Sequence, residues 1–157
     1  MAKEQDHPNI SPIVHPPIIV LIYIVAAYLL GRFVPQPFVL SMIWRNVGLL
    51  LTFMGFLLGI GAFIEFRRAR TTLDPHGSSR QVVNSGIYRF TRNPIYLGFL
   101  LMLIGLPLNS GLIWGIVLAP LYILTMTRLV IEREEAYLED KSKDQYTSYK
   151  SRVRRWL

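Results

Sequence analysis

Two short segments of the sequence gather side chains that could bind a charged ligand. In the first, GIYRFTRNPIYLG at residues 86–98, two arginines, an asparagine and two tyrosines lie close together. Pro94 suits the first turn of a helix, because the N–H that proline lacks is one that a helix start leaves unbonded. Backbone N–H groups at such a start attract anions. Arg89 and Arg92 beside Pro94 therefore predict a site for an anionic group.

The second segment, residues 128–138, places an arginine and three carboxylates where an apolar stretch ends. Arg128, Glu132 and Glu135 are spaced by four and three residues, which puts them on one face of a helix. Ionisable groups at a membrane boundary are costly unless solvated or paired, and by default they indicate function. A plain ion pair between Arg128 and Glu132 is the alternative interpretation.

Other residue types that carry chemistry are absent or poorly spaced. The chain has no cysteine, which excludes a cysteine nucleophile, a disulfide and a cysteine-ligated metal. His7, His15 and His76 lack the spacing of metal ligands, so no metal is predicted. Asp74, His76 and Ser78 fall within one short loop, whereas a hydrolytic triad is assembled from separated elements. We interpret them as turn residues.

The composition predicts that these segments border a lipid bilayer. Of 157 residues, 52% are hydrophobic and 17% charged, against about 45–50% and about 25% in a soluble domain. The charged residues leave long gaps, and a membrane-spanning helix needs roughly 20 mostly apolar residues. We predict a single all-α integral membrane domain over residues 1–157. Its four transmembrane helices are expected at about residues 18–34, 46–66, 94–107 and 111–131, the third being short.

The basic residues predict the orientation. The loop at residues 67–93 holds six arginines, and the chain from Arg128 onward, with the tail at residues 132–157, holds eight more Lys or Arg. Because Lys and Arg beside membrane spans stay in the cytoplasm, we expect the loop, the tail and both termini there. The net charge of +7 is thus explained by topology, and no nucleic-acid partner is predicted.

The tail carries a hydrophobic stripe. Tyr146, Tyr149, Val153 and Trp156 are spaced by three, four and three residues, which predicts one face of an amphipathic helix. Two interpretations are weighted equally: the helix lies on an anionic leaflet, or it packs on the protein's own cytosolic loop.

Glycines spaced by four occur in two predicted spans, at Gly55 and Gly59 and at Gly111 and Gly115. Small residues at this spacing let membrane helices approach closely. We interpret both pairs as packing contacts rather than as cofactor-binding motifs.

Residues 83–98, followed by Glu134 and Glu135 and then by residues 146–153, resemble the isoprenylcysteine carboxyl methyltransferase and phospholipid N-methyltransferase superfamily. The resemblance covers about residues 80–153. It implies an S-adenosylmethionine pocket at the cytosolic ends of the last helices, with a lipid-side tunnel for a hydrophobic acceptor. Asn93 and Arg154 depart from the His and Pro of the eucaryal prenylcysteine enzymes, so the acceptor does not carry over. The positions that match are Arg92, Pro94, Tyr96, Gly98, Glu134 and Glu135.

The resemblance and the chemistry of the side chains together give a set of expected site residues. An arginine can pair with the cofactor carboxylate, a glutamate can accept from the ribose or the ammonium group, and Tyr88 and Asn93 can serve the adenine. Arg128 and Glu132 are the expected catalytic residues, with Glu132 as the base if the acceptor is a protonated amine. The expected cofactor-binding residues are Tyr88, Arg89, Arg92, Asn93, Pro94, Tyr96, Gly98, Glu134 and Glu135.

We therefore expect methyl transfer from S-adenosylmethionine to a hydrophobic, membrane-partitioned acceptor, with membrane lipid as the surrounding partner. Carboxyl O-methylation of a prenylcysteine-like acceptor is the first expectation. N-methylation of a phospholipid amine and S-methylation of a small thiol are the alternatives. A different class, a non-catalytic basic module that binds anionic lipid, also stays open, and no oligomeric state is predicted.

Overall fold

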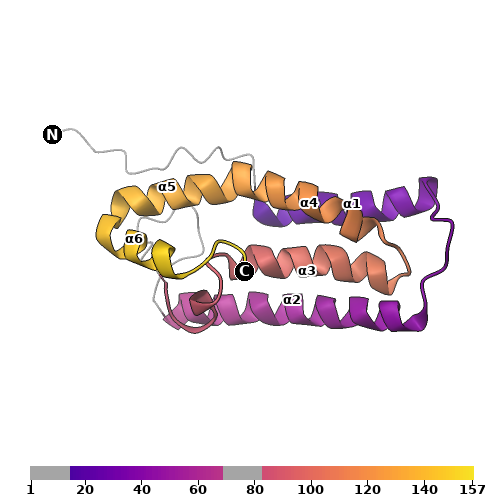
Figure 1. Cartoon of the computed structure of the whole chain (residues 1–157), viewed down its shortest axis with the longest axis horizontal. Helices are drawn as coiled ribbons and strands as arrows, with labels where there is room; N and C mark the ends of the chain where they lie inside the picture. Colours follow the sequence, from indigo (N-terminus) through magenta and orange to yellow (C-terminus); the bar gives the residue numbers. More distant parts are fainter. Residues whose placement is uncertain (1–14, 69–82) are drawn as a thin grey trace.

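The computed structural model describes residues 15–68 and 83–157, and every regular element in these two ranges is a helix. The predicted all-α fold is confirmed. Four helices lie side by side, and the chain after them bends back over one end of the bundle (Figure 1). In chain order the elements are α1 (Pro16–Phe33), α2 (Met42–Arg68), the short 3-10 helix η1 (Gly86–Arg89), α3 (Pro94–Asn109), α4 (Trp114–Met126), the π-helical segment η2 (Thr127–Ile131), α5 (Glu132–Lys141) and α6 (Lys143–Arg152).

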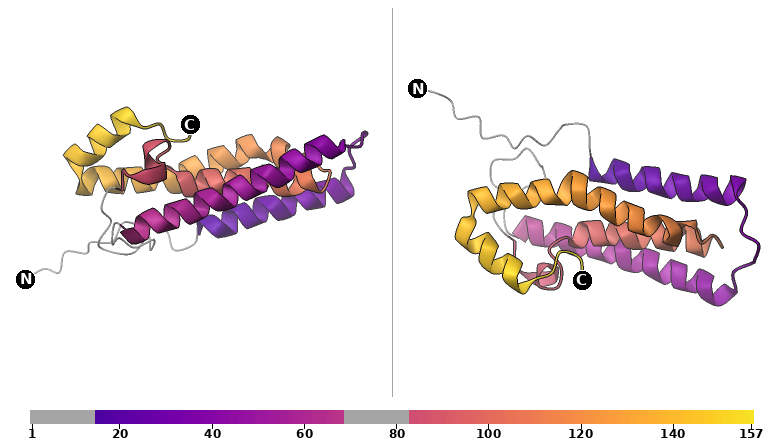
Figure 2. Two further views of the ribbon diagram at one scale, coloured as in Figure 1. Left: turned by 90° about the horizontal axis from the view of Figure 1, so that it is seen from below. Right: turned by 45° about the horizontal axis from the view of Figure 1, so that its top comes forward.

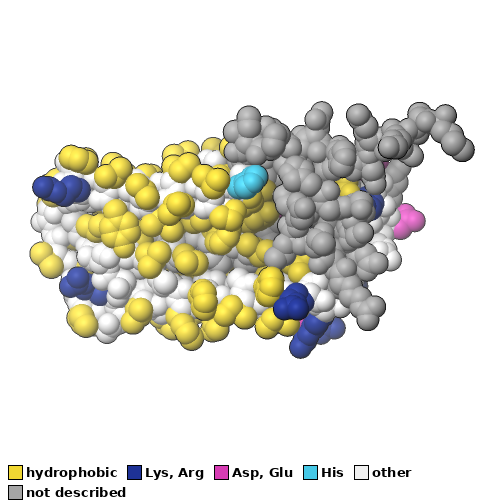
Figure 3. Space-filling view, turned by 180° about the vertical axis from the view of Figure 1, so that it is seen from behind, with side chains coloured by type: hydrophobic (Ala, Val, Ile, Leu, Met, Phe, Trp, Pro, Cys, Tyr) yellow, Lys and Arg dark blue, Asp and Glu magenta, His cyan; other side chains and the backbone are white. Residues whose placement is uncertain are grey.

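Three stretches are long and apolar enough to cross a membrane: Pro16–Phe33, Met42–Arg68 and Trp114–Lys141. The first matches the span predicted at residues 18–34. The second begins four residues before the span predicted at residues 46–66 and ends two residues after it. Large apolar side chains remain exposed along these helices, and the face drawn in Figure 3 is hydrophobic between two basic ends. Such a surface is typical of one that faces lipid.

The predicted short span at residues 94–107 is α3, which has 16 residues, about 24 Å at about 1.5 Å per residue. It contacts α2 on one side and α1 and α4 on the other (Figure 2). Many of its side chains are therefore buried. Because neighbouring helices cover much of its surface, α3 exposes less apolar surface to lipid than an isolated span would.

Glycines bring the backbones of α2 and α3 together at two levels. A Cβ added to Gly98 would lie 2.7 Å from the carbonyl oxygen of Gly55, and one added to Gly105 would lie 2.6 Å from that of Gly48. These distances leave no room for a side chain. The predicted packing role is confirmed for Gly55, whereas a Cβ on Gly59 would meet nothing within 4 Å.

The fourth predicted span, residues 111–131, does not end where the tail begins. Helix α4 passes through η2 into α5 without a break, so one helical path runs from Trp114 to Lys141. The five residues of η2 have π-helical geometry, which frequently occurs at functional sites. Helix α5 thus carries its carboxylates out of the apolar region as a continuation of α4.

The hydrophobic stripe of the tail packs on the protein itself, which is the second of the two predicted alternatives. Tyr146 and Tyr149 are 2% and 5% exposed and form a buried cluster with Ala62 and Tyr88. The Tyr149 hydroxyl donates a hydrogen bond of 2.7 Å to the backbone carbonyl of Tyr88. Helix α6 is therefore held against η1 rather than presenting these rings to a leaflet.

Candidate functional site

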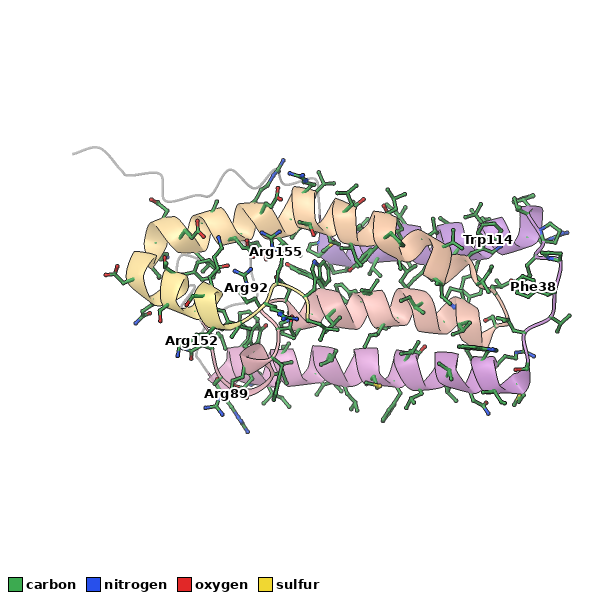
Figure 4. All side chains as sticks on the ribbon, viewed as in Figure 1. Phe38, Arg89, Arg92, Trp114, Arg152 and Arg155 are labelled. Carbon is green, nitrogen blue, oxygen red and sulfur yellow. The ribbon has the colours of Figure 1, made fainter. Side chains whose placement is uncertain are left out.

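The two chemistry-bearing segments meet at one end of the bundle. Arg92 and Arg155 lie together at this end in Figure 4, and Phe38 and Trp114 lie at the opposite one. Helix α3 begins here at Pro94, with Asn93 as an N-cap residue that makes no side-chain capping bond. A cavity of about 120 Å³ opens between η1, the start of α3, α5 and α6. Seven predicted residues line it: Tyr88, Arg92, Asn93, Pro94, Tyr96, Glu134 and Glu135.

Two arginines converge on the carboxylate of Glu135. Arg92 Nη2 lies 3.2 Å from Glu135 Oε1, and both side chains are at least nine-tenths buried. Arg155 approaches the same carboxylate with two donors, Nε at 3.1 Å from Oε1 and Nη2 at 2.6 Å from Oε2. The hydrogen bond to Glu135 raises the pKa of Arg155 above its ordinary value. Two guanidinium groups thus face one buried carboxylate.

The end of the chain closes this arrangement through its backbone. We call residues 153–157 the C-terminal strap. The backbone N–H of Arg92 donates to the carbonyl of Arg154 at 3.0 Å. The carbonyl of Arg155 accepts from Thr91 Oγ1 at 3.2 Å and from Asn93 Nδ2 at 2.9 Å. The strap therefore contacts the turn of residues 91–93, which carries Arg92.

Tyrosines orient the remaining polar groups. The Tyr96 hydroxyl lies 3.0 Å from both carboxylate oxygens of Glu134 and donates to them. The Tyr146 hydroxyl accepts from Arg92 Nη1 at 3.4 Å. Burial, together with the nearby Glu135 and against the opposing effect of Arg92, raises the pKa of the Tyr146 phenol to about 12. Tyr146 therefore stays neutral at physiological pH.

One donor of the buried Arg92 guanidinium is left unpaired in the part of the chain that the structure describes. Its Nη atoms are used by Glu135 and Tyr146, but its buried Nε has no hydrogen-bond partner among the described residues. Buried polar atoms are nearly always paired, and an exception calls for an explanation. An anionic group in the adjoining cavity would supply the missing acceptor.

Four predicted site residues lie outside the cavity lining. Arg89 is exposed on η1, and Gly98 lies against the backbone of Gly55. Arg128 and Glu132 form the ion pair that was the alternative interpretation, with Arg128 Nη1 3.5 Å from Glu132 Oε2 and side chains 68% and 40% exposed. They sit at the junction of η2 and α5, beside the site rather than in its wall.

Sequence reasoning missed three residues at or near the site. Tyr146 was predicted only as part of the hydrophobic stripe of the tail. Arg155 was counted only among the basic residues of the tail. Glu65, the lone carboxylate of α2, is 8% exposed and accepts a hydrogen bond of 2.5 Å from Ser85. Its carboxyl group packs against Gly86, whose φ of +55° is one that glycine adopts readily. A carboxylate at the end of an apolar helix was the available signal.

A second, apolar groove adjoins the site. It lies between α2 and α3, has a volume of about 340 Å³, and is lined by Gly55, Phe56, Gly59, Ile60, Phe63, Ile95, Phe99 and Met102. Ile95 also lines the polar cavity. An apolar surface on the bundle thus connects to the charged site through one side chain.

Comparison with known proteins identifies a matching protein family. The family described as "Phospholipid methyltransferase" matches residues 43–144. An uncharacterized protein of Haemophilus influenzae is 44% identical over 66 residues, which are 40% of this chain and the whole of that protein. No solved structure is significantly similar to the chain.

Proposed function

Because the chain belongs to the phospholipid methyltransferase family, we propose that it is an integral membrane enzyme that uses S-adenosylmethionine to methylate a hydrophobic acceptor. The observation that carries this proposal is the buried Arg92, with one unpaired donor, beside a cavity that adjoins an apolar groove. A charged cofactor and an apolar acceptor need these two environments side by side.

The residues of the cavity fit the cofactor. When bound, S-adenosylmethionine would supply a methyl group from its sulfonium centre to a nucleophilic acceptor and leave as S-adenosylhomocysteine. Arg92 would bind the cofactor carboxylate through Nε, supported by the start of α3. Glu134 and Glu135 would accept from the ribose hydroxyls or the ammonium group. Tyr88 would contact the adenine, and Asn93 would shape the same wall while its amide holds the strap.

The groove between α2 and α3 suits an acceptor that arrives from the bilayer. Its lining is apolar, and burying an acceptor chain there is worth roughly 0.8 kcal/mol per methylene. A small thiol would gain almost none of this. The family description favours testing a phospholipid amine before a prenylcysteine carboxylate.

Arg128 and Glu132 enter the proposal for their chemistry, because they lie on η2 and α5, whereas α2 and α3 line the groove. Their exposed pair lies where the helical path leaves the apolar region. A protonated amine, with a pKa of about 10, must lose a proton before it attacks the methyl group. Glu132 would take that proton, and Arg128, 3.5 Å away, would hold its carboxylate in position.

Cofactor binding tests the enzyme proposal directly. We expect the detergent-solubilised protein to bind S-adenosylhomocysteine in calorimetry, and Arg92→Ala to weaken binding at least tenfold because it removes the buried donor. Arg89→Ala is the matched control, since Arg89 is exposed nearby and outside the cavity lining. No binding by the wild-type protein would favour the non-catalytic lipid-binding module.

The acceptor is tested with a substrate series and one groove variant. Methyl transfer is measured with phosphatidylethanolamine, N-acetyl-S-farnesylcysteine and methanethiol, each below saturation. Gly59→Leu should fill the groove without a clash at Cβ, because nothing lies within 4 Å. We expect it to lower transfer to the long-chain acceptors several-fold while cofactor binding stays unchanged. The highest turnover with methanethiol, or no effect of Gly59→Leu, would contradict the groove as the acceptor site.

A further inference from the structure

We propose that Arg155 is a positioning residue of the cofactor site: it fixes the carboxylate of Glu135 and so sets the geometry that a bound cofactor meets. This inference rests on the proposed function. It concerns a residue of the C-terminal strap, outside the two segments that predicted the site from the sequence.

The contacts on Glu135 are unequal. Arg92 reaches one carboxylate oxygen at 3.2 Å, whereas Arg155 reaches both, at 3.1 and 2.6 Å. Two parallel donors from a planar guanidinium fix the orientation of a carboxylate, and one donor does not. Arg155 therefore determines how Glu135 points, and Arg92 keeps its Nε for a ligand.

Arg155 also connects two parts of the site through separate groups. Its side chain contacts α5 at Glu135, while its backbone carbonyl accepts from Thr91 and Asn93 ahead of α3. The backbone contacts do not depend on the side chain. Replacing the side chain should thus release Glu135 while the strap stays bound to the turn of residues 91–93, which separates positioning from folding.

The position of Arg155 permits chemical rescue. Its side chain is 32% exposed, whereas that of Glu135 is 8% exposed. A small guanidinium ion could therefore enter the space left by Arg155→Ala and pair with the carboxylate. A residue needed only for folding would not be replaced by a diffusible ion.

The experiment measures the affinity for S-adenosylhomocysteine by calorimetry. We expect Arg155→Ala to bind S-adenosylhomocysteine at least tenfold more weakly than wild type. Millimolar ethylguanidinium should reverse at least half of the resulting change in log Kd. Ethylammonium, which lacks the planar pair of donors, should restore much less. Arg154→Ala, which changes the exposed neighbour, should bind like wild type.

A double-mutant cycle gives a second readout. Once Glu135→Gln has removed the charged partner, adding Arg155→Ala should change affinity less than twofold, because the two residues act through one contact. If wild type does not bind, the proposed function is wrong and this inference with it. If wild type binds and Arg155→Ala binds equally well, or its loss is additive with Glu135→Gln and not rescued, only the inference is wrong.

Discussion

Buried charge is the feature that distinguishes this site at the scale of single residues. Arg92 and Glu135 are 43 positions apart in the sequence, yet their side chains pair while nine-tenths buried. Removing one member of such a pair costs about 3–5 kcal/mol, because the other charge stays desolvated. Binding measurements on variants of these residues must therefore be accompanied by measurements of their folding.

Glu132 gives a prediction that separates chemistry from cofactor binding. Glu132→Gln should lower methyl transfer to phosphatidylethanolamine by about 10²-fold or more, the usual contribution of a general base. Its affinity for S-adenosylhomocysteine should be unchanged, since Glu132 is not in the cavity lining. Glu139→Gln, in an exposed pair with Lys150, is the control. Unchanged transfer by Glu132→Gln would remove the base from the proposal.

Tyr146 gives a pH prediction. Its pKa is raised from about 10 to about 12, so the folded state favours the neutral phenol. The stability that this burial contributes is fully present below pH 10 and is lost as the pH rises through 12. The free energy of unfolding of wild type should fall over this window more steeply than that of Tyr146→Phe, measured by thermal unfolding in detergent. Parallel curves would contradict the shift.

The residues show what a single sequence could and could not indicate. The meeting of Arg92 with Glu135 could be predicted, because each ends an apolar stretch and two such ends share one side of a membrane. Arg155 could not be predicted, because it lies in a run of basic residues. Its role depends on the chain leaving helix α6 at Arg152 and turning back toward α3.

At the scale of elements, the contact between α2 and α3 positions the site. Gly55 and Gly98 meet close to the start of α3, and Gly48 and Gly105 meet further along both helices. Gly98 was expected to bind cofactor, but its observed contact is with α2. Its influence on binding would therefore act through the placement of α3.

Paired glycine variants test this contact. Gly105→Ala would place its Cβ 2.6 Å from the Gly48 carbonyl, and overpacking of this kind typically costs about 1–3 kcal/mol. We expect a lower midpoint of thermal unfolding in detergent. Gly59→Ala faces open space and should be neutral or slightly stabilising. Equal midpoints for the two variants would contradict the close backbone contact.

The sequence could predict four apolar helices, but not how far the last one continues. The spacing of Arg128, Glu132 and Glu135 already indicated one helix face across the end of the apolar span near residue 131, and the helical hydrogen bonding runs on through η2 into α5 as far as Lys141. The π-helical geometry of η2 could not be predicted from its residue types. The tail stripe likewise predicted a buried face without indicating what would cover it.

At the scale of the whole molecule, the distribution of basic residues and the arrangement of the helices distinguish the same two ends of the bundle. The end of α2, η1, α5 and α6 lie at one end of the bundle, whereas Phe38 and Trp114 mark the other (Figures 1 and 4). Most Lys and Arg residues belong to the first end. The positive-inside rule then predicts that the candidate site faces the cytoplasm.

Single cysteines test this orientation, since the chain contains none. Ser148→Cys lies on an exposed position of α6, and Val39→Cys replaces a residue that is 96% exposed at the other end. In intact cells an impermeant thiol reagent should label position 39 and leave position 148 unmodified until the membrane is permeabilised. The reverse pattern would invert the topology.

The contact between Asn93 and Arg155 also imposes an order on biosynthesis. The two residues are 62 positions apart, and translation at roughly 5–20 residues per second separates them by roughly 3–12 s. During that interval α4 has to cross the bilayer before Arg155 can reach Arg92 and its neighbours. The first three helices are therefore made before both the Glu135 carboxylate that pairs with Arg92 and the strap, so we expect the ligand site to form late in folding.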